Sequence, residues 1–319
     1  GEAMKVKVQG ERWFPVEKSF GVIQKDYWGD WYCDSEVGTL RSILLRRPGK
    51  EVECITEENY SDYRFRGVID PVKAREQQDA YAELLRKQGV TVHYVEEMRD
   101  DRPNAMFMRD NVLMTPEGAI ISRQAMESRL GEERYTAQAL ANLGVPIIKT
   151  INGDGIFEGA CAMWVDRETV VLGSGPRSNA SGIRQIENEL LNMKVTNIIH
   201  EQIPFGSIHL DGYMNMVDKK KIFVFPWHLS YDCAKSLLDL DIQIIEATDV
   251  DEVKQTMGMN FITLAPGKVI MPTGNQITRS ILEKEGVEVL EVEIDEILKG
   301  WGALHCMSVF LKRDPLAQC

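Results

Sequence analysis

Residues 285–292, Glu-Gly-Val-Glu-Val-Leu-Glu-Val, show the pattern that organises the whole chain: a predicted helix ends at Gly286 and an apolar strand follows. The same transition from helix to strand begins at residues 88, 143, 193 and 240, so successive copies lie 55, 50, 47 and 45 residues apart. Three copies place a glycine at the transition, as Gly89, Gly144 and Gly286, where a left-handed residue commonly ends a helix. A period of about 50 residues indicates a repeated supersecondary unit.

The residues between successive copies predict two strands and a helix. After Asp110, residues 111–114 and 119–121 form a strand pair around the Pro-Glu-Gly turn at 116–118, and a helix follows over roughly 131–143. The same strand pair is expected at 162–165 with 170–172, at 214–217 with 222–225, and at 261–264 with 269–271. None of these units can bury an apolar face alone, so five of them must stack or close into a ring. We favour the five-unit ring over a generic doubly wound α/β sheet, which also alternates strands and helices.

The composition narrows the class of protein. The 319 residues carry a net charge of −12, and nucleic acid is therefore not an expected partner, because its binding depends on basic patches. The six cysteines are scattered without a CxxC pair, which argues against a zinc site of the usual spacing and against the disulfide framework of a secreted protein. A polar N-terminus and the lack of an apolar stretch of about 18 residues predict neither a signal peptide nor a membrane span. We therefore expect a cytoplasmic protein without a membrane partner.

Polar or reactive residues recur where each unit enters its next strand. They are Asp110, Glu158, the pair His209 and Asp211, and Cys306. Each alone is more often structural: a buried cysteine usually behaves as a small hydrophobe, and an aspartate beside an arginine is commonly a surface pair. In a closed ring, however, equivalent positions converge near the axis at one end. The recurrence therefore predicts one cavity that holds a nucleophile, a base and several carboxylates, which is the set that covalent catalysis requires.

At these residues the sequence resembles the guanidino-group modifying enzymes, the superfamily of arginine deiminases, arginine dihydrolases, dimethylarginine dimethylaminohydrolases and amidinotransferases. The resemblance covers nearly the whole chain. Its motifs are residues 36–41 with 44–50, Phe-Met-Arg-Asp at 107–110, Glu-Gly at 158–159, His-Leu-Asp at 209–211, and the Gly-rich segment 302–307. It implies an α/β fold, the five-bladed pseudo-symmetric ββαβ propeller (the pentein fold). Residues 36–319 are then expected to be a single catalytic domain of five repeats, and residues 1–35 an N-terminal extension.

The resemblance also implies catalytic roles. Cys306 is the expected nucleophile, His209 the acid and base, and Glu158 the residue that orients the imidazole or holds its charge. Asp110 and Asp211 are expected to grip the guanidinium, a planar cation whose N–H groups match carboxylate oxygens. The implied chemistry is attack of the thiolate on the central carbon, followed by hydrolysis of a thiouronium intermediate.

Three further residues are expected to bind the amino-acid end of the substrate. Arg177, and Arg129 on a looser alignment, would read the carboxylate, with Asn104 near the amino group. Neither a cofactor nor a metal is expected: His305 beside Cys306 could suggest a metal pair, but adjacent residues on a strand point to opposite faces. The expected partner is a small-molecule substrate, and the sequence allows a homo-oligomer.

The exact reaction stays open, because the chain departs from the deiminase pattern in three ways. Ala160-Cys161 replaces the usual Gly-Asp, Asn111 replaces the usual proline, and the chain lacks room for the helical insertion of long bacterial deiminases. The expected reaction is hydrolysis of arginine or a close analogue to citrulline, or to ornithine after a second hydrolysis, with release of ammonia. A methylated arginine is a further substrate option. The alternatives are amidino transfer to an acceptor amine, and a non-catalytic propeller that acts as a binding module.

Overall fold

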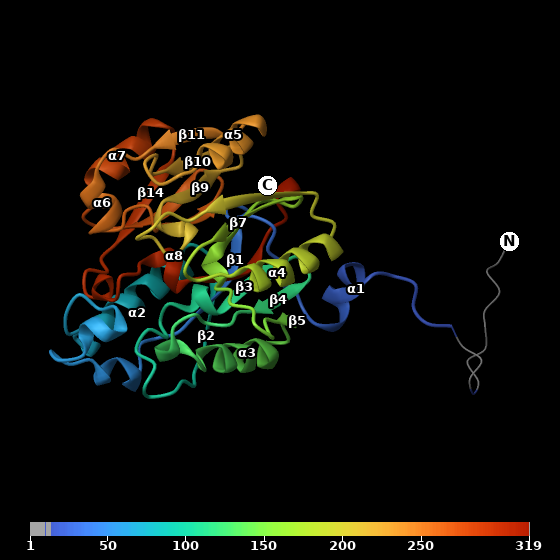
Figure 1. The fold of residues 1–319 in the computed structure, drawn as a ribbon, viewed down its shortest axis with the longest axis horizontal. Coiled ribbons are helices and arrows are strands. Elements are labelled where there is room, and N and C mark those ends of the chain that lie inside the picture. Colours follow the sequence, from blue (N-terminus) through green and yellow to red (C-terminus); the bar gives the residue numbers. More distant parts are fainter. Residues whose placement is uncertain (1–9, 11–13, 319) are drawn as a thin grey trace.

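The strands of the protein form five separate three-stranded sheets, arranged as blades (Figure 1). The computed structural model describes residue 10 and residues 14–318. The blades are β15–β1–β2, β3–β4–β5, β6–β7–β8, β9–β10–β11 and β12–β13–β14. Their strands are β1 (Leu40–Leu45), β2 (Thr91–Tyr94), β3 (Val112–Thr115), β4 (Gly118–Ile121), β5 (Ile147–Thr150), β6 (Ala162–Asp166), β7 (Thr169–Ser174), β8 (Asn197–Gln202), β9 (Met214–Asp218), β10 (Lys221–Val224), β11 (Gln243–Glu246), β12 (Ile262–Ala265), β13 (Lys268–Pro272), β14 (Glu288–Val292) and β15 (Val309–Arg313).

Every blade has the same internal order. Its first strand pairs antiparallel with the second, and the second pairs parallel with the third. A helix makes the crossover between the two parallel strands, as such a connection requires. These helices are α2 (Pro71–Lys87), α3 (Glu132–Leu143), α4 (Ala180–Asn192), α5 (Tyr231–Asp239) and α7 (Gln276–Lys284). The predicted fold class, an α/β propeller of five ββαβ units, is confirmed.

The two ends of the propeller meet in the first blade. Its first strand, β15, comes from the C-terminal end of the chain and pairs with β1, so that Phe310 lies opposite Ile43. The first strands of neighbouring blades contact each other, as β15 does β3 and β9 does β12. Residues that precede these strands are therefore brought toward one another.

The five predicted transitions from helix to strand share one backbone conformation. Each has a residue with positive φ within two residues of the end of its helix: Gly89 at 84°, Gly144 at 88°, Lys194 at 66°, Asp241 at 60° and Gly286 at 83°. The expectation of a left-handed residue is thus confirmed at the three glycines. Two copies adopt the same conformation without glycine, although a side chain makes it less favourable. The backbone conformation therefore repeats in all five copies, whereas glycine occurs at this position in three of them.

The predicted elements are present with ends shifted by one or two residues. The strand pair expected at 111–114 and 119–121 is β3 and β4, for example, and the helix expected over 131–143 is α3. The pattern did not predict the helices α1 (Phe20–Tyr27) and α6 (Val250–Lys254). No helix in the described part of the chain is both long and apolar enough to cross a membrane.

The predicted N-terminal extension, 1–35, lies partly outside the described residues, as does Cys319. Its described part includes α1 and then contacts the propeller. The N–H of Tyr32 donates to the carbonyl of Leu311 at 3.1 Å, and the N–H of Cys33 donates to that of Thr115 at 3.3 Å.

Candidate active site

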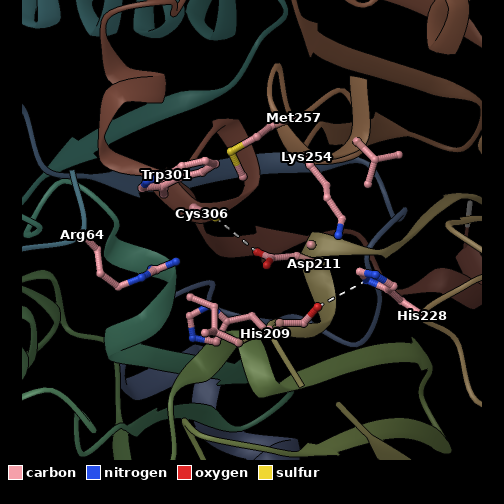
Figure 2. A pocket seen from close by; sticks show the side chains of 13 residues that line it. Arg64, His209, Asp211, His228, Lys254, Met257, Trp301 and Cys306 are labelled. Carbon is pink, nitrogen blue, oxygen red and sulfur yellow. Dashed lines mark hydrogen bonds between the residues drawn. The ribbon is translucent and has the colours of Figure 1, made fainter. Parts of the chain in front are cut away.

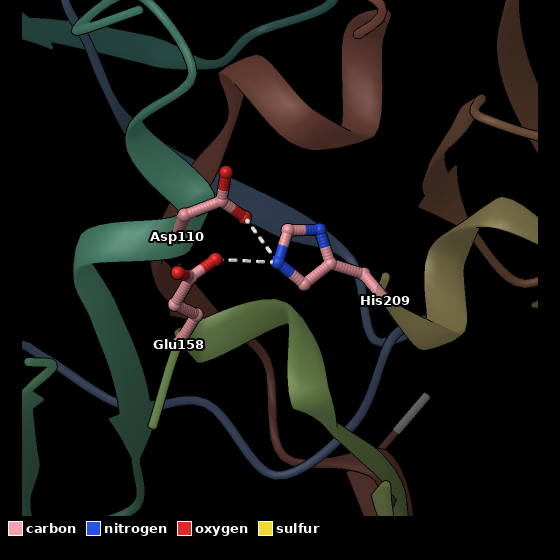
Figure 3. Close-up of side chains that lie close together, drawn as sticks. All are labelled: Asp110, Glu158 and His209. Atoms are coloured by element: carbon pink, nitrogen blue, oxygen red, sulfur yellow. Dashed lines mark hydrogen bonds and ion pairs between the residues drawn. The ribbon is translucent and has the colours of Figure 1, made fainter. Parts of the chain in front are cut away.

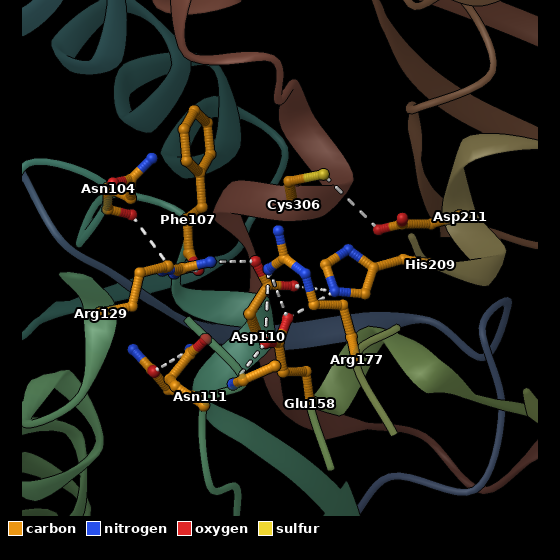
Figure 4. Close-up of polar contacts among 12 residues, drawn as sticks. Asn104, Phe107, Asp110, Asn111, Arg129, Glu158, Arg177, His209, Asp211 and Cys306 are labelled. Atoms are coloured by element: carbon orange, nitrogen blue, oxygen red, sulfur yellow. Dashed lines mark hydrogen bonds and ion pairs between the residues drawn. The ribbon is translucent and has the colours of Figure 1, made fainter. Parts of the chain in front are cut away.

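Four short helical turns carry or adjoin the predicted catalytic residues, and at most one residue separates each turn from the first strand of a blade. They are η3 (Met108–Asn111), η5 (Gly159–Cys161), η6 (Leu210–Gly212) and α8 (Leu304–Met307), which lead into β3, β6, β9 and β15. Neighbouring turns contact each other, α8 with η3, η3 with η5, and η5 with η6. The ring thus brings residues from distant parts of the sequence into one cluster, which Figure 4 shows.

The candidate nucleophile, Cys306, is buried on α8 and faces a carboxylate. Its Sγ lies 3.6 Å from Oδ2 of Asp211. Its backbone N–H donates to Oδ1 of Asn260 at 3.0 Å, and Nδ2 of Asn260 donates to the carbonyl of Asp211 at 3.2 Å. Asn260 therefore fixes the cysteine turn relative to the aspartate. It stands at the recurring polar position of the repeat, yet the sequence interpretation gave it no role.

The imidazole of His209 stands between two carboxylates (Figure 3). Its Nε2 lies 2.7 Å from Oε1 of Glu158 and 3.6 Å from Oδ1 of Asp110. The other oxygen of Glu158 accepts the N–H of Ala125 at 3.0 Å. Oδ1 of Asp110 has no hydrogen-bond partner among the described residues. Since buried acceptors are normally satisfied, this oxygen is available to a ligand.

The charges of the cluster set its protonation states. Burial disfavours an imidazolium, but the carboxylates of Asp110 and Glu158 outweigh it and raise the pKa of His209. Burial likewise disfavours a charged Glu158, yet His209 outweighs it and lowers the pKa of that carboxyl to about 2. Burial, followed by the charges of Asp211 and Asp110, raises the pKa of the Cys306 thiol well above its ordinary value. The resting cluster therefore holds a thiol beside an imidazolium–carboxylate pair.

The spacing of Asp110, Glu158 and His209 would also suit a metal ion, because one ligand atom from each lies within 4.8 Å of the others. Both carboxylates, however, already bind a guanidinium: Arg129 binds Asp110 and Arg177 binds Glu158. The expectation that the site needs no metal stays a prediction.

Arg129 and Arg177, the expected carboxylate readers, are paired with acids. Nη1 of Arg129 donates to Oδ2 of Asp110 at 2.6 Å, while its Nε and Nη2 donate to the two oxygens of Glu132 at 2.9 and 2.8 Å. Nη1 of Arg177 donates to Oε1 of Glu158 at 3.1 Å. The guanidinium of Arg129 is thus occupied on both sides. Its expected role at the substrate carboxylate stays a prediction, as does that of Arg177.

The cluster opens into a cavity whose wide part has a volume of about 350 Å³ (Figure 2), and a narrow part of about 20 Å³ adjoins it. Cys306 and His209 line both parts. The wide part is also lined by Arg64, Asp211, His228, Lys254, Met257 and Trp301, and the narrow part by Arg64, Asn104, Phe107, Asp110, Met126, Arg129, Arg177 and Trp301. Glu158 is fully buried and lines neither part, so it would act through His209.

His305 has a place in this site that the sequence interpretation missed. Its Nδ1 lies 2.7 Å from Oδ2 of Asp211, and its Nε2 lies 3.0 Å from Oε2 of Glu36. The reason for setting it aside was wrong, because His305 and Cys306 lie on the helical turn α8 and not on a strand. Successive side chains on a helix diverge by about 100° rather than pointing to opposite faces. Both side chains therefore reach the same oxygen of Asp211, and His305 holds that carboxylate in place.

Comparison with known proteins identifies a family that this chain matches. The family described as N,N dimethylarginine dimethylhydrolase, eukaryotic, matches residues 67–312. The arginine deiminase of Bacillus cytotoxicus is 22% identical over 407 residues, which cover 89% of this chain and 99% of that protein.

Solved structures share the fold at low sequence identity. DDAH from Pseudomonas aeruginosa, solved as a mutant complexed with citrulline, is 24% identical with a TM-score of 0.70, over 85% of this chain and 99% of that one. SxtG, an amidinotransferase of saxitoxin biosynthesis from Microseira wollei, is 15% identical with a TM-score of 0.74, over 89% and 97% of the two chains.

Proposed function

Because the chain belongs to the N,N-dimethylarginine dimethylhydrolase family and is an enzyme that acts on guanidino C–N bonds, we propose that it hydrolyses the guanidinium group of arginine or a close analogue, with Cys306 as nucleophile. One observation carries this proposal: the sulfur of Cys306, an oxygen of Asp110 that accepts no hydrogen bond, and His209, which pairs with Glu158, meet at the narrow part of the cavity. A thiol, an acceptor for a cation and a proton donor are the parts that covalent hydrolysis of a guanidinium requires.

Asp110 and Asp211 would hold the substrate cation. A guanidinium presents N–H groups in one plane, and carboxylates pair with it strongly where water is excluded. Oδ1 of Asp110 is free to accept, and Oδ2 of Asp211 lies 3.6 Å from the sulfur of Cys306. A cation between these two carboxylates would thus have its central carbon beside the nucleophile.

Binding of the cation would also activate the thiol. After burial, the charges of Asp211 and Asp110 are what raise the pKa of Cys306. A bound guanidinium offsets both charges, so the thiol releases its proton to solvent and the thiolate forms in the complex with substrate. Because the thiolate would form only when substrate is bound, the sulfur of the substrate-free enzyme would stay unreactive.

His209 would serve both halves of the reaction. In the first half the thiolate forms a bond to the guanidinium carbon, the C–N bond breaks, and the imidazolium of His209 protonates the departing amine. In the second half the neutral imidazole takes a proton from water, and the hydroxide attacks the thiouronium carbon. The C–S bond then breaks and the hydroxyl proton of the adduct passes to the departing sulfur, which gives a urea and the thiol of Cys306. Glu158, 2.7 Å from Nε2, would stabilise the imidazolium in each cycle.

Amidino transfer is the second candidate, because it also begins with attack of the thiolate on the guanidinium carbon; ornithine then leaves instead of ammonia, and the amidino group on Cys306 passes to an acceptor amine. The wide part of the cavity favours it to a degree: beside Cys306 it offers room toward His228 and Lys254, where an acceptor amine could bind. Hydrolysis is the first candidate, since the matched family and the deiminase relative are named as hydrolysing enzymes.

The test is product identification. The protein is incubated in ¹⁸O-labelled water with arginine or a methylated arginine, with and without glycine as acceptor amine. Hydrolysis predicts ¹⁸O in citrulline, a second hydrolysis predicts ornithine, and transfer predicts a glycine-dependent product without label. Cys306→Ala is expected to make none of these, whereas Cys54→Ala, a half-buried cysteine away from the cavity, is expected to keep full activity. Near-normal turnover by Cys306→Ala, or none by the unaltered protein, would contradict the proposal.

The proposal extends to the organisation of the molecule. Residues 36–319 form one catalytic domain and residues 1–35 an extension of it. The enzyme is cytoplasmic, acts on a small molecule without a metal or cofactor, and can exist as a homo-oligomer. The five described cysteines are all free.

A further inference from the structure

Three guanidinium groups face the cavity, and they differ in what they bind. Arg129 and Arg177 are paired with carboxylates of the site. Arg64 lines both parts of the cavity, yet its side chain has neither a hydrogen-bond partner nor an ion-pair partner among the described residues. Figure 2 shows it reaching into the cavity from the side opposite Lys254 and His228. A half-buried cation with no anion is a position where a ligand anion would bind favourably.

The backbone holds Arg64 in this place. It ends η2 (Tyr60–Tyr63) in the left-handed conformation, with φ 60° and ψ 36°, and its N–H donates to the carbonyl of Ser61 at 3.1 Å. Nδ2 of Asn104 donates to the carbonyl of Tyr63 at 2.8 Å and so ties this loop to the site. A non-glycine residue in this conformation costs free energy and is commonly found where function requires it.

The same contact leaves an acceptor beside Arg64. Because Asn104 uses its NH₂ group on Tyr63, its Oδ1 has no partner among the described residues and is buried. Arg64 and Asn104 together therefore present a guanidinium that donates and an amide oxygen that accepts. These two groups match the two halves of an α-amino acid, a carboxylate and an ammonium.

The charges around Arg64 favour the same ligand. Burial, and then the positive charge of Arg177, lower the pKa of Arg64. Arg129 acts in the same direction, whereas the charge of Asp110 opposes it. An anion bound between Arg64 and Arg177 would remove this repulsion.

We propose that Arg64 binds the carboxylate of the substrate and, with Asn104 at the amino group, makes the enzyme specific for guanidines that carry an amino-acid end. This assignment rests on the proposed function. It places Arg64, rather than Arg129, as the principal anchor, because Arg129 is enclosed by Asp110 and Glu132.

The proposed role of Arg64 is tested by comparing arginine with agmatine, which is arginine without its carboxylate. A residue that binds the carboxylate should matter for arginine and not for agmatine. The tested variant is Arg64→Asn, because asparagine accepts the left-handed conformation and carries no positive charge. For arginine we expect kcat/KM to fall about 10- to 100-fold, mostly through KM, as for loss of a charge-assisted hydrogen bond. For agmatine we expect the same kcat/KM as with the unaltered protein. Arg64→Lys should recover part of the lost kcat/KM for arginine. Arg47→Asn, which removes an exposed guanidinium, should leave kcat/KM unchanged for both arginine and agmatine.

Equal losses for arginine and agmatine, or no loss for arginine, would overturn the assignment. Protection of Cys306 from iodoacetamide gives a second reading that needs no turnover. If the unaltered protein turns over neither compound, the proposed function fails. The role of Arg64 can still be tested by how well each compound protects Cys306 from iodoacetamide. The assignment stands if arginine protects better than agmatine and Arg64→Asn abolishes that difference. It falls if arginine has no advantage in the unaltered protein.

Discussion

Oδ2 of Asp211 lies 3.6 Å from the sulfur of Cys306, so a thiolate at this position would stand beside a like charge. The same oxygen is hydrogen-bonded to Nδ1 of His305 at 2.7 Å, and this bond holds the carboxylate in its orientation. The nucleophile is thus held next to a group that suppresses its ionisation and that is also suited to bind a cationic substrate. The carboxylate of Asp211 thus both suppresses ionisation of the Cys306 thiol and is placed to bind the substrate cation.

Asp211→Asn is expected to make the resting thiol more reactive while it removes activity. After burial, the charge of Asp211 is the largest cause of the raised pKa of Cys306, so its loss lowers that pKa. Each unit of pKa removed should speed alkylation by iodoacetamide about tenfold below the thiol pKa. Turnover should fall, because the guanidinium loses one of its two carboxylates. The control is Asp239→Asn on the exposed face of α5; slower alkylation of Asp211→Asn would contradict this account.

Glu158→Gln is expected to move the alkaline limb of the kcat–pH profile to lower pH. Burial lowers the pKa of His209, and Asp110 and Glu158 raise it overall, so loss of the Glu158 charge lowers it. The imidazolium is the proton donor, and activity should therefore decline at a lower pH than in the unaltered enzyme. The profile is measured over roughly pH 5 to 10. Glu168→Gln, in an exposed turn, should leave the profile unchanged, and an alkaline shift in Glu158→Gln would refute the assigned pair.

The contact between Glu36 and His305 predicts how stability depends on pH. Burial raises the pKa of Glu36, but His305 and Arg109 outweigh it and bring it to about 2, below its ordinary value of 4.5. The stability from Glu36 is thus present above about pH 4.5 and lost as pH falls toward 2. Burial and Arg109 lower the pKa of His305, but Glu36 and Asp211 outweigh them and raise it above 6.5. The contribution of His305 to stability is therefore fully present below pH 6.5 and is lost as pH rises through the raised pKa.

Glu36→Gln should therefore lower the free energy of unfolding near neutral pH and flatten its decline in acid. Urea unfolding of both proteins between about pH 3 and 7 measures the difference. Parallel curves would show that the Glu36–His305 contact has no influence on acid stability.

Arg129→Met is expected to destabilise the fold more than any change at Arg64. Arg129 is 4% exposed and pairs with Asp110 and Glu132, so its removal leaves two buried carboxylates without their cation. The expected loss is about 3–5 kcal/mol of unfolding free energy. Urea unfolding compares it with Arg64→Asn, for which a loss below about 1 kcal/mol is expected. Similar losses for both variants would show that Arg129 is not structural.

Local features of the sequence were enough to predict the repeated unit but not how the ring closes. The transitions near Gly89, Gly144 and Gly286 lie on backbone positions that the fold repeats, and the strand pairs follow from their turns. The pairing of β15 with β1 joins segments more than two hundred residues apart, and no local period of the chain reports it. α1 lies before the first copy of the repeat and was missed for the same reason.

Within the site, recurrence predicted residues that stand at one position of the repeat, such as Glu158. The glycine after it has a steric reason: a Cβ on Gly159 would collide with the carbonyl oxygens of Arg109 and Val112. Arg64 gave no signal, because η2 lies outside the repeated positions. His305 gave a misleading one, since the sequence did not show that α8 replaces a strand there.

The central claim is that the sulfur of Cys306 becomes covalently bound to the guanidinium carbon. The most direct measurement is intact-protein mass spectrometry after acid quench of the enzyme during turnover of arginine, followed by peptide mapping. The account predicts a mass increase equal to arginine minus ammonia, located on the peptide that contains Cys306 and absent from Cys306→Ala. Turnover that continues with no adduct at any time point, or an adduct on another residue, would contradict it.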